Sequence, residues 1–223
     1  QLAVMAFGIA DTMVASRYSA SALAALSVGS AVFISVYASL MGIFQALLPV
    51  WAEHRGARQP EAIGHSLRQC LYLYLYAACC VLGMWVLLSP DALLRATRVP
   101  PELQKEVKLY LGVLALGLPP ALLFLIYSAL NQALGRPQLV TWLQVLSLAA
   151  KVPLSIWFTF GGAGVAAMGA EGCAWGTVAV NYLMGALALT LLRRQDFYAP
   201  LRLWQRLGGP DWPLLARFAR LGL

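Results

Sequence analysis

Long apolar runs separated by short polar stretches make up most of this chain. Six runs carry the pattern, at residues 1–15, 22–50, 70–88, 107–130, 139–160 and 173–192. Crossing a bilayer takes about 20 apolar residues in a helix, and in lipid a helix satisfies its own backbone hydrogen bonds. The pattern therefore predicts an all-α membrane protein, folded as a bundle of six transmembrane helices.

The polar stretches give the expected connections between these helices. We predict loops at Ser16–Ser19, Glu53–Ser66 and Ser89–Lys105. A tight connection follows at Asn131–Pro137, and a glycine-rich joint lies between Gly161 and Gly172.

Glycine and proline also mark where the bundle is interrupted and where it ends. Pro119 and Pro120 fall inside the fourth run and predict a kink, because proline removes a helical hydrogen bond. We predict a transmembrane lobe over residues 1–194, a cytoplasmic linker over 195–212 and the start of a seventh helix over 213–223. The first run is too short to span and the last helix is only begun, so we expect a fragment of a longer protein.

The composition agrees with a membrane location. The chain of 223 residues is 61% hydrophobic and 11% charged, whereas soluble domains are about 45–50% apolar and 25% charged. The four cysteines all lie in apolar runs and are expected to be small core residues, while His54 and His65 share a polar loop without metal-ligand spacing. We expect no metal site, no disulfide framework and no cofactor.

The basic residues indicate an orientation in the membrane. The formal net charge is +7, but no basic stripe with interleaved aromatic residues points to nucleic acid as a partner. If the first helix runs outward, the inner loops hold about twice as many basic residues as the outer loops, which places the N-terminus in the cytoplasm. The inner set is Arg55, Arg58, Arg68, Arg136, Arg193, Arg194, Arg202, Arg206, Arg217 and Arg220. The outer set is Arg17, Arg95, Arg98, Lys105 and Lys108.

Asp11 places a carboxylate inside the first apolar run, between Phe7 and Met13. A charged side chain in the bilayer costs about 2.5–3.5 kcal/mol on insertion scales, so an acid within a span is a functional-site candidate. The alternative is that Asp11 reaches toward the membrane edge near Ser16, although its side chain is short.

Lys151 is the second costly residue, because it lies past the middle of the fifth run and far from either surface. Asp11 is the carboxylate available to it within the apolar runs, and Ser155, four residues on, shares its helical face. We predict a buried ion pair between the first and fifth helices. The pair serves either ion coupling or packing alone, and in both cases removing one partner costs more than removing both.

Several stretches of the chain resemble the multidrug and toxic compound extrusion (MATE) family. Ile9–Ser16 followed by Ser19–Val28 resembles the signature of that family's first helix. Leu48–Gly56 resembles the end of its second helix, Ala133–Pro137 its fourth-to-fifth connection, and Val152 through Thr177 its fifth and sixth helices. The resemblance covers the whole chain with the spacing preserved.

The resemblance implies that the chain is the N-terminal, six-helix lobe of a twelve-helix transporter with two lobes. It also implies a secondary antiporter that exports small organic compounds in exchange for protons or sodium, as a multi-pass monomer in a bacterial inner membrane. The family's essential first-helix acid corresponds to Asp11, and the threonine of its cation site to Thr177. Tyr37, Gln45 and Asn181 are candidates to line the substrate cavity.

Two positions depart from the family's pattern. Helix-five positions that are usually asparagine, or asparagine and aspartate, are Lys151 and Ser155 here. An ammonium beside Asp11 takes the place of a coordinated cation, so we expect protons rather than sodium as the coupling ion, and a neutral or anionic substrate becomes compatible with the site. The expected ion-coupling set is Asp11, Lys151, Ser155 and Thr177.

Other functions stay open at this point. A lipid-linked oligosaccharide flippase of the same superfamily would line its cavity with several basic residues, whereas only Lys151 is placed inside the membrane. An intramembrane enzyme would need a nucleophile with a base, a metal cluster or paired carboxylates at membrane depth, which the apolar runs do not supply. In a non-transporting membrane subunit, Asp11 and Lys151 would serve packing alone. We predict a transporter and not an enzyme.

Overall fold

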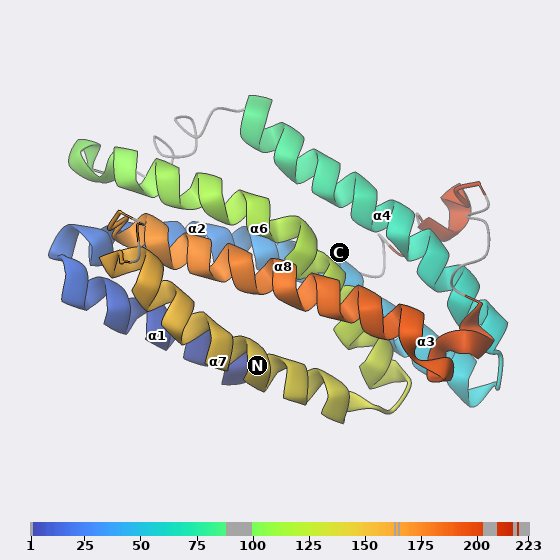
Figure 1. Ribbon diagram of the computed structural model, residues 1–223. Coiled ribbons are helices and arrows are strands. Elements are labelled where there is room, and N and C mark those ends of the chain that lie inside the picture. The colour runs from blue at the N-terminus through green and yellow to red at the C-terminus, as the bar shows by residue number, and fades with distance from the viewer. Residues whose placement is uncertain are drawn as a thin grey trace.

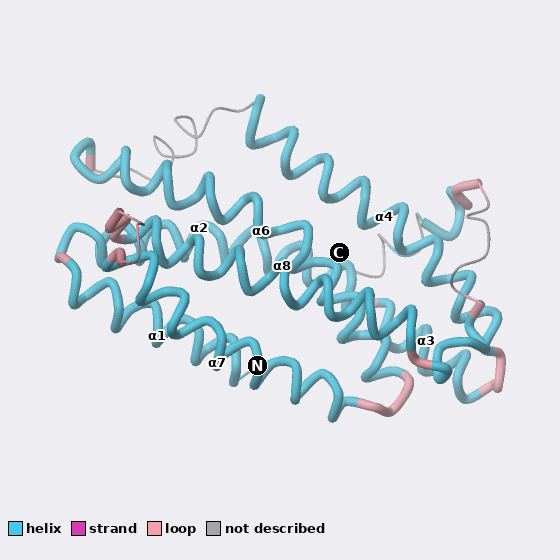
Figure 2. The backbone as a smooth tube through the Cα atoms, in the orientation of Figure 1, coloured by secondary structure: helices cyan, strands magenta, loops and turns pink. Residues whose placement is uncertain are grey.

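The computed structural model describes residues 2–87, 100–162, 164, 166–202, 209–215 and 218. Helices make up nearly all of this described part, and Figure 2 draws no strand in it. The elements are α1 (Leu2–Tyr18), α2 (Ala20–Gln45), α3 (Leu47–Gly56), α4 (Pro60–Leu87), α6 (Pro101–Ala133), α7 (Pro137–Phe160), α8 (Ala170–Arg194) and the 3-10 helix η1 (Asp196–Leu201).

The long helices run side by side, and successive spans run in opposite directions (Figure 1). α6 packs against α8 and α2 in the middle of the bundle, while α7 packs against α8 and α1 along one side. The α1–α2 turn and the joint after α7 gather at one end of the bundle, and the α3–α4 turn and η1 gather at the other.

Within the described residues, four helical segments are long and apolar enough to cross a membrane. These are Ala20–Gly56, Pro101–Ala133, Pro137–Phe160 and Ala170–Arg194. With α1 and α4 beside them, they account for the six predicted apolar segments and confirm the all-α membrane bundle.

The polar loop predicted at Glu53–Ser66 is wrong. α3 continues to Gly56 and α4 already begins at Pro60, so the connection is a short turn over residues 57–59. Polar residues do not prevent a helix when one face is buried, as at Ile63, which is 2% exposed. Proline also suits the first turn of a helix, where its missing N–H has no intrahelical partner to lose.

Two smaller expectations about side chains also fail. His54 and His65 lie on α3 and α4 rather than in a loop. Cys79 and Cys80 are exposed on α4 instead of buried, whereas Cys70 and Cys173 are buried as expected. A strongly hydrophobic helix still presents one face to lipid or to a partner, which the apolar run alone does not reveal.

Prolines shape two of the spans. α2 ends at Gln45, the residue whose carbonyl would accept a hydrogen bond from position 49, and Pro49 has no N–H to give. Pro119 and Pro120, in contrast, lie inside α6, which is one helix from residue 101 to 133. Figure 1 shows α6 changing direction where it passes α8, as the double proline predicts.

The stretch predicted as a linker begins with a folded segment. η1 follows α8 directly and returns to the bundle, where the Tyr198 hydroxyl donates a hydrogen bond of 2.7 Å to Asn131 Oδ1 on α6. Residues 212–215 are helical again. Arg206, Arg217 and Arg220, and most of the Ser89–Lys105 stretch, lie outside the described residues, while Lys105 is on α6.

Candidate functional site

The predicted pair of Asp11 and Lys151 is present in the structure. Asp11 on α1 is 7% exposed and Lys151 on α7 is 2% exposed. Lys151 Nζ donates to Asp11 Oδ2 over 2.7 Å, and the Ser155 hydroxyl donates to Asp11 Oδ1 over 3.3 Å. Both carboxylate oxygens therefore have a donor from α7, one helical turn apart.

The spacing along α7 explains why these donors reach the same carboxylate. Residues four apart lie on one face of a helix, and the buried polar residues of α7 follow that spacing at Ser147, Lys151, Ser155 and Thr159. The sequence analysis predicted only Lys151 and Ser155 of this set. Extending the same spacing of four residues in both directions would also have identified Ser147 and Thr159.

α8 closes the site from another side. The Cys173 thiol lies 3.3 Å from the Thr159 hydroxyl and 4.0 Å from the backbone oxygen of Asp11. Cys173 was expected only as a small core residue. Its position in the first turn of α8 follows from the tertiary packing, and nothing in its sequence neighbourhood indicates contact with α1.

Glycines let α8 approach α7 this closely. A Cβ at Gly172 would meet the backbone of Phe158, and a Cβ at Gly176 would lie 2.7 Å from the Ser155 hydroxyl oxygen. Small residues at a helix interface allow two backbones to come together in a membrane. The glycines therefore help to hold Ser155 against Asp11.

An aromatic ring covers the ammonium group. Lys151 Nζ lies 4.6 Å from the centroid of the Phe7 ring, which comes from the turn of α1 before Asp11. A cation over an aromatic face is stabilised by the ring's quadrupole. α1 thus supplies both the carboxylate and the ring that receive Lys151.

The site carries no net charge and offers no metal cage. Asp11 and Lys151 are the buried charged residues of the described part, and their charges cancel. Among the described residues, no group of three or more His, Cys, Asp or Glu side chains is arranged to hold a metal ion.

Thr177 and the three cavity candidates lie outside this cluster of direct contacts. Thr177 Oγ1 donates to the Cys173 carbonyl of its own helix over 3.0 Å. Asn181 Nδ2 donates to the Gly117 carbonyl over 3.3 Å, next to the double proline of α6. Tyr37 stacks on Phe33 with ring centroids 6.1 Å apart, and the half-buried Gln45 ends α2. The structure thus joins Asp11, Lys151 and Ser155 directly, whereas Thr177, Asn181 and Tyr37 contact other groups.

The sequence is similar to those of known membrane proteins. A sequence profile of the MatE family matches residues 1–157. The whole chain is 35% identical to a probable multidrug resistance protein NorM of Aromatoleum aromaticum, covering 48% of it. It is 31% identical to multidrug resistance protein MdtK of Klebsiella pneumoniae, covering 49% of it.

Solved structures of similar fold agree. The whole chain superposes on 48% of the MATE transporter NorM-NG, solved in complex with a monobody, with a TM-score of 0.77 and 27% identity. An inward-facing multidrug resistance MATE transporter shares the fold with a TM-score of 0.84 over 97% of this chain and 48% of its own, at 20% identity.

Fold and site together define a multi-pass helical membrane protein with an ion pair enclosed between its packed helices. The chain belongs to the MatE family, whose members are transporters rather than enzymes. It spans about half the length of the curated relatives it matches.

Proposed function

We propose that the chain is the N-terminal lobe of a secondary antiporter that exports small organic compounds in exchange for protons, with Asp11 as the coupling carboxylate. The observation that carries the proposal is the buried contact of 2.7 Å between Lys151 and Asp11. Ionisable residues inside membrane segments usually mark ion pathways or binding sites. The relatives' names, which describe multidrug resistance, support the export of organic compounds.

Protonation of Asp11 is the proposed switch. A neutral Asp11 gives Lys151 no counter-ion and offers Ser155 a weaker acceptor, so α1 loses the contacts that hold it to α7. Release of the proton restores these contacts. Transporters of this general kind move whole groups of helices around a site near the middle of the membrane, and α1 is the helix that this switch would free.

The same pair argues for protons over sodium. The Lys151 ammonium already occupies one carboxylate oxygen of Asp11, and Ser155 occupies the other. A sodium ion at this place would have to displace Lys151 and leave its charge buried without a partner, which is costly. Thr177 completes the proposed coupling set on α8.

The neutral pair also bears on the substrate. A site with no net charge attracts organic cations less strongly than a free carboxylate does. The proposed substrates therefore include neutral and anionic compounds. Tyr37, Gln45 and Asn181 are proposed to line the cavity. A flippase has less support, because Lys151 is the one buried cation in the part of the chain that the structure describes.

The proposal includes a topology. Residues 1–194 form the lobe in the bacterial inner membrane with the N-terminus in the cytoplasm, 195–212 form the cytoplasmic linker, and 213–223 begin a seventh helix. Turns and basic residues at the α3–α4 end of the bundle agree with the excess of arginine and lysine on the cytoplasmic side.

Transport by the full-length protein in liposomes tests the proposal. We expect an imposed pH gradient, and not a sodium gradient, to drive dyes chosen to be cationic, neutral or anionic. Asp11→Asn and Lys151→Met should each lower the rate at least about tenfold, the loss expected when about 1.4 kcal/mol of coupling is removed. The control is Thr12→Ala, since Thr12 is exposed beside Asp11 and its side chain, among the described residues, bonds to the Gly8 carbonyl of its own helix alone. Wild-type rates from both site variants would refute the role of the pair.

A further inference from the structure

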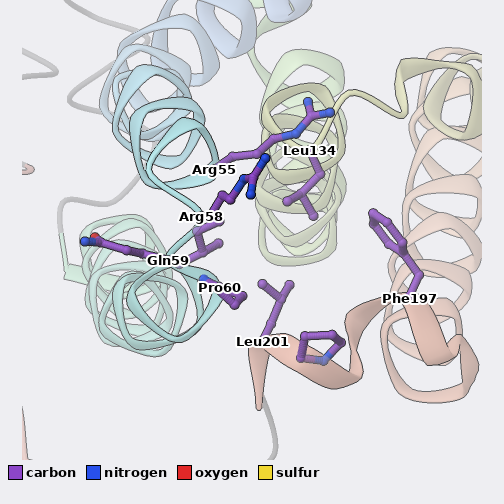
Figure 3. A pocket seen from close by; sticks show the side chains of 9 residues that line it. Arg55, Arg58, Gln59, Pro60, Leu134, Phe197 and Leu201 are labelled. Atoms are coloured by element: carbon purple, nitrogen blue, oxygen red, sulfur yellow. The ribbon is translucent and has the colours of Figure 1, made fainter.

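A second site lies at the end of the helical bundle that is opposite the α1–α2 turn. A cavity of about 280 Å³ opens between the α3–α4 turn, the end of α6 and η1. Figure 3 shows Arg55 and Arg58 on one side of it and Leu134, Phe197 and Leu201 around the rest. The cavity thus combines guanidinium groups with an apolar wall.

Arg55 is held in place at the cavity. Its Nη1 donates to the Ala133 carbonyl over 3.1 Å. The guanidinium lies directly against Gly135, where a Cβ would collide with it, and Gly135 also has a φ of 69° that favours glycine. The Ala133 carbonyl and Gly135 therefore position a cation from α3 at the cavity.

Arg58 adds a second cation, and among the described residues it forms no ion pair with a carboxylate. It sits in the α3–α4 turn with a φ of 55°. The residues that line the cavity include no aspartate or glutamate. The acidic residue at the start of α4, Glu61, is paired with Arg202 at 3.0 Å. The cavity is therefore a positively charged site that suits an anion.

The apolar wall comes from a segment that is firmly attached to the bundle. η1 is fixed by the Tyr198 bond to Asn131, by the Arg68 bond of 2.7 Å to the Arg202 carbonyl, and by contact of the Leu201 carbonyl with Gly64. Phe197, which faces the cavity, carries the Arg136 guanidinium 3.7 Å above its ring. The apolar wall is therefore held by contacts within the bundle.

A cavity lined by both cations and apolar side chains favours a lipid over a free anion. An inorganic phosphate would need only the arginines, whereas a phospholipid presents a phosphate next to its glycerol and acyl chains. Basic pockets at the cytoplasmic ends of spanning helices attract anionic headgroups. We propose that this cavity binds the phosphate headgroup of an anionic phospholipid from the inner leaflet, an assignment that uses the proposed orientation but not the proposed transport activity.

Lipid titration followed by native mass spectrometry tests the site on the full-length transporter. Phosphatidylglycerol and phosphatidylcholine are added at equal concentrations, and inorganic phosphate is added separately as a competitor. We expect one phosphatidylglycerol to bind in preference to phosphatidylcholine. Arg58→Asn should weaken that binding about tenfold, as expected for the loss of a charge-assisted hydrogen bond.

The variants are matched so that folding and charge are separated. Asparagine accepts a positive φ, so Arg58→Asn removes the charge while keeping the turn, and Arg58→Lys should retain most of the preference. Arg194→Gln removes a charge from the exposed end of α8 without touching the cavity lining. Equal binding by wild type and Arg58→Asn, an equal loss in Arg194→Gln, or full displacement by millimolar phosphate would each overturn the proposal.

Discussion

At the level of single residues, the buried carboxylate of Asp11 is stabilised by the groups around it rather than by its own position on α1. Lys151 and Ser155 each donate to one of its oxygens, and the Phe7 ring lies 4.6 Å from the ammonium. Because both charges are nearly inaccessible, each depends on the other for compensation. Coupling between the two residues is therefore the measurable consequence.

A double-mutant cycle tests that coupling. Asp11→Asn and Lys151→Met should each destabilise the protein by about 3–5 kcal/mol, because each leaves an uncompensated buried charge, while the double variant should be close to wild type. Thermal unfolding of the purified full-length variants measures the three differences. Additive losses in the double variant would mean that the two side chains do not depend on each other.

At the level of the helices, the site joins α1 to α7, and the contact of α7 with α8 supports it. Gly172 and Gly176 bring the backbones together, and Ser155 lies against Gly176 on one side and Asp11 on the other. α1 packs mainly against α7 and α2, and it also contacts α8. A change in the spacing of α7 and α8 should therefore reach Asp11 without altering any charged group.

Gly176→Ala tests this relation. The added methyl group would meet the Ser155 hydroxyl, so we expect a loss of about 1–3 kcal/mol from overpacking and a lower transport rate. Gly8→Ala is the matched control, because no described atom lies within 4 Å of a Cβ built there, and alanine favours the helix by about 0.5–1 kcal/mol. The same response from both variants, in thermal unfolding and in transport, would contradict the proposed role of the interface.

Over the bundle as a whole, the two ends are chemically different. One end, formed by the α3–α4 turn and η1, contains the cavity and its arginines. The other end is formed by the α1–α2 turn, which follows the ion-pair site along α1. In the proposed topology the spans run from one end of the bundle to the other, so these ends lie on opposite sides of the membrane. Their assignment to the cytoplasm and the outside is a direct consequence of the proposed topology.

Cysteine labelling checks that assignment. In a background with the four native cysteines replaced by alanine, Ser16→Cys should react with a membrane-impermeant maleimide in intact spheroplasts. Ala57→Cys, in the α3–α4 turn, should react only after the membrane is permeabilised. Both positions are exposed in the structure, so the reversed pattern of labelling would place the N-terminus outside.

The membrane class, the six spans and the pairing of Asp11 with Lys151 could all be predicted from the order of the amino acids. The length of an apolar run decides whether the segment can cross lipid. Two opposite charges buried in such segments have few other partners available, so they are expected to pair. The likeness of Ile9–Ser16 and of the stretch through Thr177 to one family also pointed to the family that the comparison found.

The surroundings of these features depend on how the helices pack in three dimensions. The connection at residues 57–59 is shorter than the predicted loop, because the helices on both sides continue where one of their faces is buried. Cys173 and Thr159 lie at the site, and Asn181 donates to the Gly117 carbonyl, because the approach of α8 to α7 and α6 sets which polar groups meet. The cavity between Arg55 and Phe197 arises in the same way, since its walls are far apart in the chain and meet only when η1 folds back. Local pattern indicates which apolar segments form helices, whereas the ends of those helices and the contacts between distant segments depend on how their side chains pack.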